Sequence, residues 1–137
     1  MFGKILYLSD NIGYIENKMT DDVSADLLNL HLIFENGDHK VLSEITEVKS
    51  DEIRVKFLGE FIDGHYYNGV LKKASLNSNI RTINEEERTE LMGVQSKKNF
   101  VMGKSATYKD SYICPSINEM LANHLCIFGN TGSGKSC

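Results

Sequence analysis

Turn dipeptides recur at short intervals in the first part of this 137-residue chain, and they limit what that part can fold into. Each is an asparagine or aspartate followed by glycine, the strongest short-range signal for a β-hairpin because these residues tolerate positive φ angles. They are Asn36-Gly37, Asp63-Gly64 and Asn68-Gly69. A chain that reverses this often has room only for short strands between its turns.

The segments between the turns have the composition of strands. Ile53, Val55 and Phe57 alternate with two basic residues, which is the pattern of a half-buried antiparallel strand. Because short strands follow one another with no helical period between them, we expect residues 1–84 to form a small closed or nearly closed β-barrel. The polar, acidic stretch at residues 19–27 interrupts this pattern, and we expect an exposed loop there.

The character of the chain changes at Asn84. Glu87 follows three residues later, the spacing of a capping box, and Gly93 is placed to end a helix of roughly two turns. Ser116 and Glu119 repeat the capping pattern before a second short helix. We therefore expect a capped helix and a linker over residues 85–118.

Residues 119–137 carry the most specific motif of the chain. Gly129, four intervening residues and then Gly134, Lys135 and Ser136 complete the phosphate-loop pattern G-x-x-x-x-G-K-[ST]. Glycines in such a loop adopt positive φ angles, which turn backbone N–H groups toward a bound phosphate. Lys135 would reach the β- and γ-phosphates of a nucleotide, and Ser136 would be a ligand of Mg²⁺.

The phosphate loop follows an apolar run at residues 125–128, which is typical of a buried parallel strand. A glycine- and serine-rich tail that matches by chance is the alternative. A phosphate-loop helix needs more than one turn, and a parallel strand needs neighbours on both sides. We therefore expect the chain to be the N-terminal part of a longer ATPase, and to be inactive in hydrolysis by itself.

The composition argues against nucleic-acid binding, membrane insertion and metal binding by this segment. The net charge of −4 and a pI near 5.5 argue against a nucleic-acid grip within this segment. No apolar run reaches membrane-spanning length and no secretory signal begins the chain, so we expect a cytoplasmic protein without membrane contact. Three cysteines and four histidines lack the spacing of metal ligands, and we expect Cys126 to be a small core residue.

Three stretches of the chain resemble the N-terminal region of HerA-type ATPases, the hexameric DNA translocases of the HerA/FtsK superfamily. EITEVKSDEIRVKFLGEF (residues 44–61) looks like the central hairpin of the HerA–ATP synthase barrel, and YYNGVLKKASLNSNIRTI (residues 66–83) resembles the closing segment of that barrel. GKSATYKDSYICPSINEMLANHLCIFGNTGSGKS (residues 103–136) is similar to the beginning of the RecA-like motor domain of the family.

The resemblance implies a mainly β fold, with a HerA–ATP synthase barrel followed by the first strand and phosphate loop of a truncated α/β RecA-like domain. It implies ATP and Mg²⁺ as cofactors, with Lys135 as the catalytic residue on the β- and γ-phosphates and Ser136 on the metal. The nucleotide-binding residues would be Gly129, Asn130, Thr131, Gly132, Ser133, Gly134, Lys135, Ser136 and Cys137.

The resemblance also implies partners. Members of the family form homo-hexamers, move double-stranded DNA through a central pore, and dock a nuclease, a sirtuin-like protein or another effector on the barrel. Archaeal relatives act in DNA-end resection and bacterial relatives in defence against phage. The DNA contacts, the residues that activate water and the arginine finger would lie beyond Cys137. A non-catalytic barrel that serves as adapter or oligomerisation module, and a rotary-ATPase-like relative, are the alternatives.

Overall fold

The computed structural model describes residues 2–19, 26–122, 126, 128–130 and 132 of the chain. It divides into two compact units, Met1–Leu91 and Met92–Cys137, and each is described by itself. The strands of the first unit are β1 (Ile5–Ser9), β2 (Ile12–Glu16), β3 (His31–Asn36), β4 (His39–Val48), β5 (Glu52–Ile62), β6 (His65–Asn68) and β7 (Asn79–Thr82). The helix α1 (Glu85–Met92) follows them.

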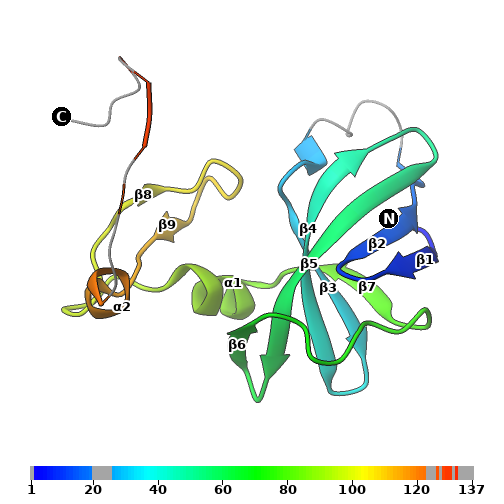
Figure 1. The fold of residues 1–137 in the computed structure, drawn as a ribbon, viewed down its shortest axis with the longest axis horizontal. Helices are drawn as coiled ribbons and strands as arrows, with labels where there is room; N and C mark the ends of the chain where they lie inside the picture. Colours follow the sequence, from blue (N-terminus) through cyan, green and yellow to red (C-terminus); the bar gives the residue numbers. More distant parts are fainter. Residues whose placement is uncertain (1, 20–25, 123–125, 127, 131, 133–137) are drawn as a thin grey trace. The chain divides into compact units, whose positions relative to one another are not determined.

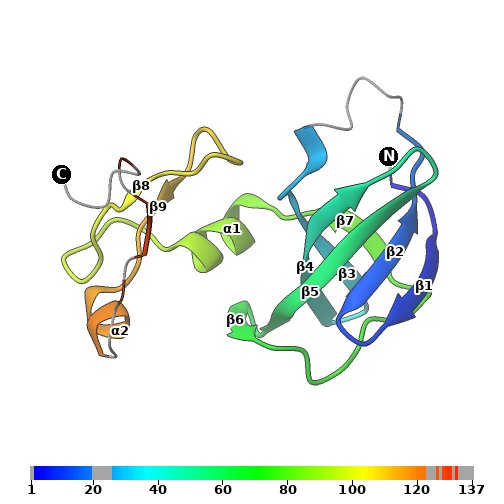
Figure 2. The same cartoon turned by 45° about the horizontal axis from the view of Figure 1, so that its top comes forward.

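The seven strands form one antiparallel sheet in the order β1-β2-β5-β4-β3-β7, and β6 pairs with the end of β5. Figures 1 and 2 show that this sheet curls, so that its two outer strands approach each other. No pairing joins β1 to β7 among the residues that the structure describes. The mainly β fold is confirmed, but the sheet is a curled half-barrel rather than a closed barrel. The reason is local, because β7 has only four residues and β1 is interrupted by an irregularity between Ile5 and Tyr7.

Two of the three predicted turns form hairpins. Asn36 pairs with His39, and Ile62 pairs with His65, so each hairpin has a two-residue loop. Gly37 is the first residue of the β3–β4 loop and Gly64 the second residue of the β5–β6 loop, and their φ angles are 62° and 84°. The third dipeptide does not join two strands of the sheet: Gly69 ends β6 by donating its N–H to the carbonyl oxygen of Leu58.

The buried hydrophobic side chains of the sheet form one core cluster. Ile53, Val55 and Phe57 are buried as their alternation predicts, and the ring of Phe57 meets that of Phe34 edge to face, with centroids 5.0 Å apart. Other fully buried members are Ile15, Leu32, Val41 and Ile45.

The acidic stretch at residues 19–27 differs from expectation at its described ends. Leu27 is a buried member of the core, and Met19 packs against it, so both ends of the stretch are anchored by apolar contacts. Residues 20–25 lie outside the described part. The prediction of a fully exposed loop was wrong at these two residues. Acidic residues dominate the composition of the stretch, but its two apolar ends determine where it packs.

The second unit contains a short hairpin of β8 (Gly103–Lys104) and β9 (Tyr112–Ile113), followed by α2 (Ile117–Leu121). Ser116 caps α2 by accepting a hydrogen bond from the N–H of Glu119, as predicted. Cys114 is buried and donates its N–H to the carbonyl oxygen of Met92.

The domain limits at residues 84 and 118 stay predictions. No helix in the described part of the chain is long and apolar enough to cross a membrane.

Gly59 provides a test of the fold, because β4, β5 and β6 meet there. A Cβ atom on Gly59 would overlap the carbonyl oxygen of Tyr67 and lie 2.7 Å from Cε2 of Tyr66. We expect Gly59→Ala to lower the free energy of unfolding by about 1–3 kcal/mol, because the paired strands must separate to relieve the overlap. Urea denaturation of the full chain measures this change.

Gly37→Asn is the control for that experiment. Gly37 also lies in the sheet's hairpins, but no atom lies within 4 Å of where its Cβ would stand, and asparagine tolerates its positive φ angle. We expect this change to alter stability by less than about 0.5 kcal/mol. Equal losses in the two variants would contradict the close approach of β6 to Gly59.

Candidate functional site

The predicted phosphate loop lies at the end of the second unit, and the structure describes three of its residues. Gly129, Asn130 and Gly132 are exposed, and Gly132 has a φ angle of 84°. Glycine adopts this left-handed conformation readily, and phosphate-binding loops use it. The remaining predicted residues lie outside the described part: Thr131, Ser133, Gly134, Lys135, Ser136 and Cys137. The roles of all nine residues of the loop stay predictions.

The buried strand expected before the loop is not present at its described residues. Cys126 and Phe128 belong to no strand, and Phe128 is 91% exposed. Cys126 is also exposed, so the prediction that it is a core residue is wrong. A parallel strand is buried only when other strands pair with it and helices cover it, and no described element does so here. Leu125 and Ile127 lie outside the described part.

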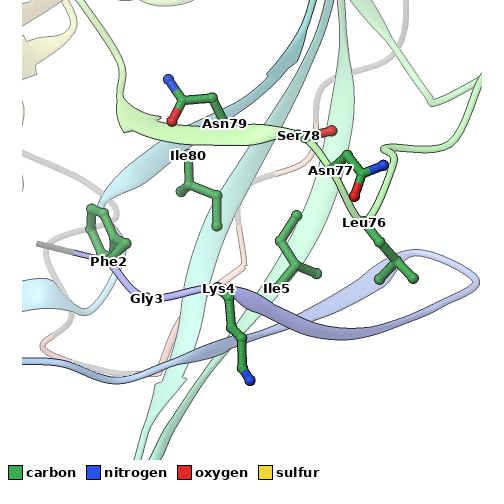
Figure 3. Close-up of a pocket in the computed structure, with 9 residues that line it drawn as sticks. All are labelled: Phe2, Gly3, Lys4, Ile5, Leu76, Asn77, Ser78, Asn79 and Ile80. Atoms are coloured by element: carbon green, nitrogen blue, oxygen red, sulfur yellow. The ribbon is translucent and has the colours of Figure 1, made fainter.

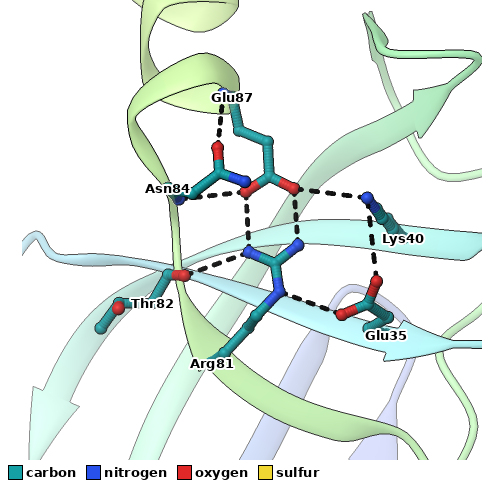
Figure 4. Close-up of polar contacts among 6 residues, drawn as sticks. All are labelled: Glu35, Lys40, Arg81, Thr82, Asn84 and Glu87. Carbon is teal, nitrogen blue, oxygen red and sulfur yellow. Dashed lines mark hydrogen bonds and ion pairs between the residues drawn. The ribbon is translucent and has the colours of Figure 1, made fainter.

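The best-defined polar site of the first unit is the junction between β7 and α1, which begins with a capping box (Figure 4). Asn84 Oδ1 accepts a hydrogen bond of 2.8 Å from the N–H of Glu87. Glu87 Oε2 in turn accepts one of 3.1 Å from the N–H of Asn84. This reciprocal arrangement satisfies two of the unpaired donors at the helix N-terminus, as the sequence predicts.

Arg81 connects the capping box to the sheet. Its Nη1 and Nη2 donate to the two oxygens of Glu87 at 2.8 and 2.6 Å, and its Nε donates to Glu35 Oε2 at 3.0 Å. Lys40 Nζ lies 3.7 Å from an oxygen of each carboxylate. The side chains come from β7, β3, β4 and α1, so one guanidinium and one ammonium group hold four elements together (Figure 4).

The electrostatics of this junction favour the ionised forms. Burial raises the pKa of Glu87, but the hydrogen bonds from Arg81 and Asn84 and the charge of Lys40 outweigh it and hold the pKa below its ordinary value of 4.5. The hydrogen bonds to Glu87 raise the pKa of Arg81. Because two carboxylates face two permanent cations, the junction can position α1 but has no free group for acid–base chemistry.

A second contact fixes the other half of α1. Glu90 Oε1 lies 3.2 Å from Nδ1 of His65 and accepts a hydrogen bond of 3.4 Å from the N–H of Tyr66. Both partners belong to β6, so the helix is held at its start by the sheet and in its last turn by the β5–β6 hairpin.

A cavity of about 300 Å³ lies between the two outer strands of the half-barrel. Figure 3 shows Phe2, Ile5 and Ile80 directed toward this space from the two edges. The lining residues 76–79 add amide and hydroxyl groups, and Lys4 is the single titratable residue of the lining. The cavity therefore marks the open edge of the barrel and lacks the paired acid and base that catalysis requires.

Metal-binding groups are absent from the described residues, where no three His, Cys, Asp or Glu side chains are placed to hold one ion. Sequence reasoning missed the Arg81 site although it found both ends of the capping box. The signal available was a basic residue three positions before a predicted N-cap. Its partners Glu35 and Lys40 could not be found, because strand pairing brings them there over more than forty residues.

The last part of the chain matches a known protein family. Residues 100–137 match the family model described as Helicase HerA, central domain. The second unit is thus similar to the central domain of HerA helicases. This supports a HerA/FtsK-type ATPase, and it agrees with the phosphate-loop pattern inside the matched segment. No curated protein matches the chain. The match does not reach the sheet, so the likeness of the sheet to a HerA–ATP synthase barrel stays a prediction.

The charge network gives a pH-dependent prediction. Glu87→Gln keeps the capping hydrogen bonds but removes the negative charge that Arg81 and Lys40 face, so we expect a loss of about 1–3 kcal/mol at pH 7. The folded pKa of Glu87 lies below its unfolded value, and its contribution is therefore lost as the pH falls through the folded pKa. The stability difference between wild type and variant should shrink steadily below pH 4.5. Urea unfolding between pH 7 and pH 3 measures it.

Glu86→Gln is the matched control, because Glu86 lies in the same first turn and is exposed. It removes the same charge near the helix N-terminus, and we expect a change within about 0.5 kcal/mol. If both variants lost the same stability at pH 7, or if the difference for Glu87→Gln persisted at pH 3, the ion pairs would not hold the helix.

Proposed function

We propose that the chain is the N-terminal part of an ATP-dependent translocase or helicase of HerA type that acts on double-stranded DNA. The observation that carries this proposal is the family match over residues 100–137, which contains the complete phosphate-loop pattern. The resemblance of residues 44–61 and 66–83 to the family's barrel supports it independently of that match.

The phosphate loop would bind ATP with Mg²⁺. Backbone N–H groups of residues 129–134 would surround the phosphates, Lys135 would neutralise the β- and γ-phosphates, and Ser136 would be a ligand of the metal. Cys137 would follow at the start of the helix whose N-terminus faces the phosphates. When bound, Mg²⁺ offsets charge on the phosphate oxygens during phosphoryl transfer. The groups that activate water and the arginine finger would come from beyond residue 137.

The half-barrel would serve assembly and docking. We propose a homo-hexamer in which the barrel takes part in ring formation and receives a nuclease or another effector, in DNA repair or in defence against phage. The net charge of −4 supports placing the DNA contacts outside residues 1–137. The site of action proposed here is the cytoplasm, without a membrane.

The alternative is a non-catalytic adapter or oligomerisation module. It is favoured by the first unit, which has its own core and its own fixed terminal helix and so has the features of an independent binding module. A rotary-ATPase-like relative shares the barrel and the phosphate loop but has no further support.

ATP turnover by the longest natural product of this reading frame tests the proposal. We expect hydrolysis that linear duplex DNA stimulates, and we expect Lys135→Ala to lower it by at least about a hundredfold, a usual effect of removing one group that stabilises developing charge. Assembly of the Lys135→Ala variant, measured by light scattering in nucleotide-free buffer, should be unchanged.

Lys97→Ala is the control variant, because Lys97 is an exposed lysine outside the loop. Its turnover should equal that of the wild type. Turnover that survives Lys135→Ala would overturn the assignment of the site, and turnover that is absent with and without DNA would favour the adapter.

A further inference from the structure

A pocket of about 500 Å³ is lined by residues of the β3–β4 and β5–β6 turns and the strand ends beside them. Figure 1 shows that the two turns lie at the same end of the sheet. Its polar and charged lining comes from the two turns, from the adjoining ends of β4 and β5, and from the segment after β6. The groups used below are Asp38, His39, Glu60, Asp63 and Lys72, with Phe61 as part of the apolar wall. None of them belongs to the phosphate loop or to the Arg81 junction.

The carboxylate of Glu60 is the most buried charged group of this pocket. Its side chain is only 6% exposed, although it carries a carboxylate. Oε1 accepts a hydrogen bond of 2.7 Å from the N–H of Lys72, whereas Oε2 lies 3.7 Å from Nε2 of His39, which is too long for a hydrogen bond. That His39 nitrogen is buried and has no hydrogen-bond partner among the described residues. In the described part of the chain, one oxygen of this nearly buried carboxylate therefore has no hydrogen bond, and its contact with the His39 imidazole is a long ion pair.

The rim of the pocket adds negative charge. Asp38 and Asp63 stand in the two turns, and no ion pair or side-chain hydrogen bond engages either of them in the described part of the chain. Lys72 is the one permanent cation of the lining. The neighbouring pocket beside α1 shares Asp38, Phe61 and Asp63 with this one. It differs in its other carboxylates, because Glu35 and Glu87 are ion-paired with Arg81 and Lys40. A nearly buried carboxylate with one hydrogen bond and one long ion pair is costly, and a cation from outside would lower that cost.

We propose that this pocket binds an arginine side chain presented by an extended segment of a partner protein. The five N–H donors of a guanidinium group fan out in one plane, so a single arginine can contact Glu60 Oε2 and the carboxylates of the two turns together. Phe61 and Ile62 provide apolar surface for its methylene groups. The inference deepens the docking role proposed above and rests on it, because it names the chemistry by which a partner would be recognised.

Two peptides test the proposal on the full chain labelled with ¹⁵N. The first is an acetylated, amidated hexapeptide with one central arginine among alanine and valine residues, and the second has citrulline in place of arginine. Citrulline has nearly the same shape but no charge. We expect the arginine peptide to shift the amide signals of residues 36–39, 60–64 and 72 in a saturable way, and the citrulline peptide to bind at least about tenfold more weakly.

Glu60→Gln keeps an acceptor for the Lys72 N–H and removes the charge. We expect it to weaken binding of the arginine peptide at least about tenfold, which corresponds to about 1.4 kcal/mol. Glu47→Gln, the same change on an exposed glutamate far along β4, should leave the affinity unchanged. If Glu60→Gln fails to fold, the double variant Asp38→Asn, Asp63→Asn at the exposed turns decides instead, and it should weaken binding by a similar factor.

Three results would overturn the proposal: equal affinity for the two peptides, shifts that lie elsewhere on the chain, or affinity that Glu47→Gln and Glu60→Gln change equally. The experiment contains neither ATP nor DNA. If it fails while the natural product still shows Lys135-dependent turnover, the pocket is wrong and the proposed ATPase stands. If the arginine peptide binds and turnover is absent, the pocket stands and the adapter is favoured.

Discussion

The pairing of β4 with β5 is the interaction on which the first unit depends. β5 also pairs with β2 and β6, and β4 also pairs with β3, so one register fixes the neighbours on both sides. That register is irregular at two places, between Leu42 and Ser43 and between Ile45 and Glu47. Such irregularities bend and twist a strand, which accounts for the curl of the sheet. The curl brings β1 toward β7 and places two hairpin turns at one end.

Local chemistry in the sequence predicts much of this arrangement. Two Asx-Gly turns, the alternation at Ile53–Phe57 and both helix caps are confirmed, because each depends on residues close together in the chain. What could not be predicted depends on strand pairing over long separations. The contact of Arg81 with Glu35 and the approach of His39 to Glu60 are examples. The exposure of Cys126 was missed for a similar reason, since it is decided by which neighbouring strands are present.

The two units divide the chemistry between them. The first contains carboxylates that are ion-paired where they hold α1, whereas Asp38 and Asp63 at the turns have no ion pair in the described part of the chain. The second contains the phosphate-loop pattern within a segment similar to the HerA central domain, and its described glycine Gly132 has the backbone conformation such a loop needs. The proposed nucleotide site and the proposed site for an arginine of a partner are together what a partner-regulated ATPase would require, and the two proposals rest on different residues.

Nucleotide binding by the longest natural product of the reading frame tests the central claim most directly. Isothermal titration in the presence and absence of Mg²⁺ compares ATP, ADP and AMP. A phosphate loop built on Lys135 and Ser136 binds through the β- and γ-phosphates, so ATP and ADP should bind in a Mg²⁺-dependent way and AMP should not. Equal binding of AMP and ATP, or no binding of ATP at all, would contradict the account.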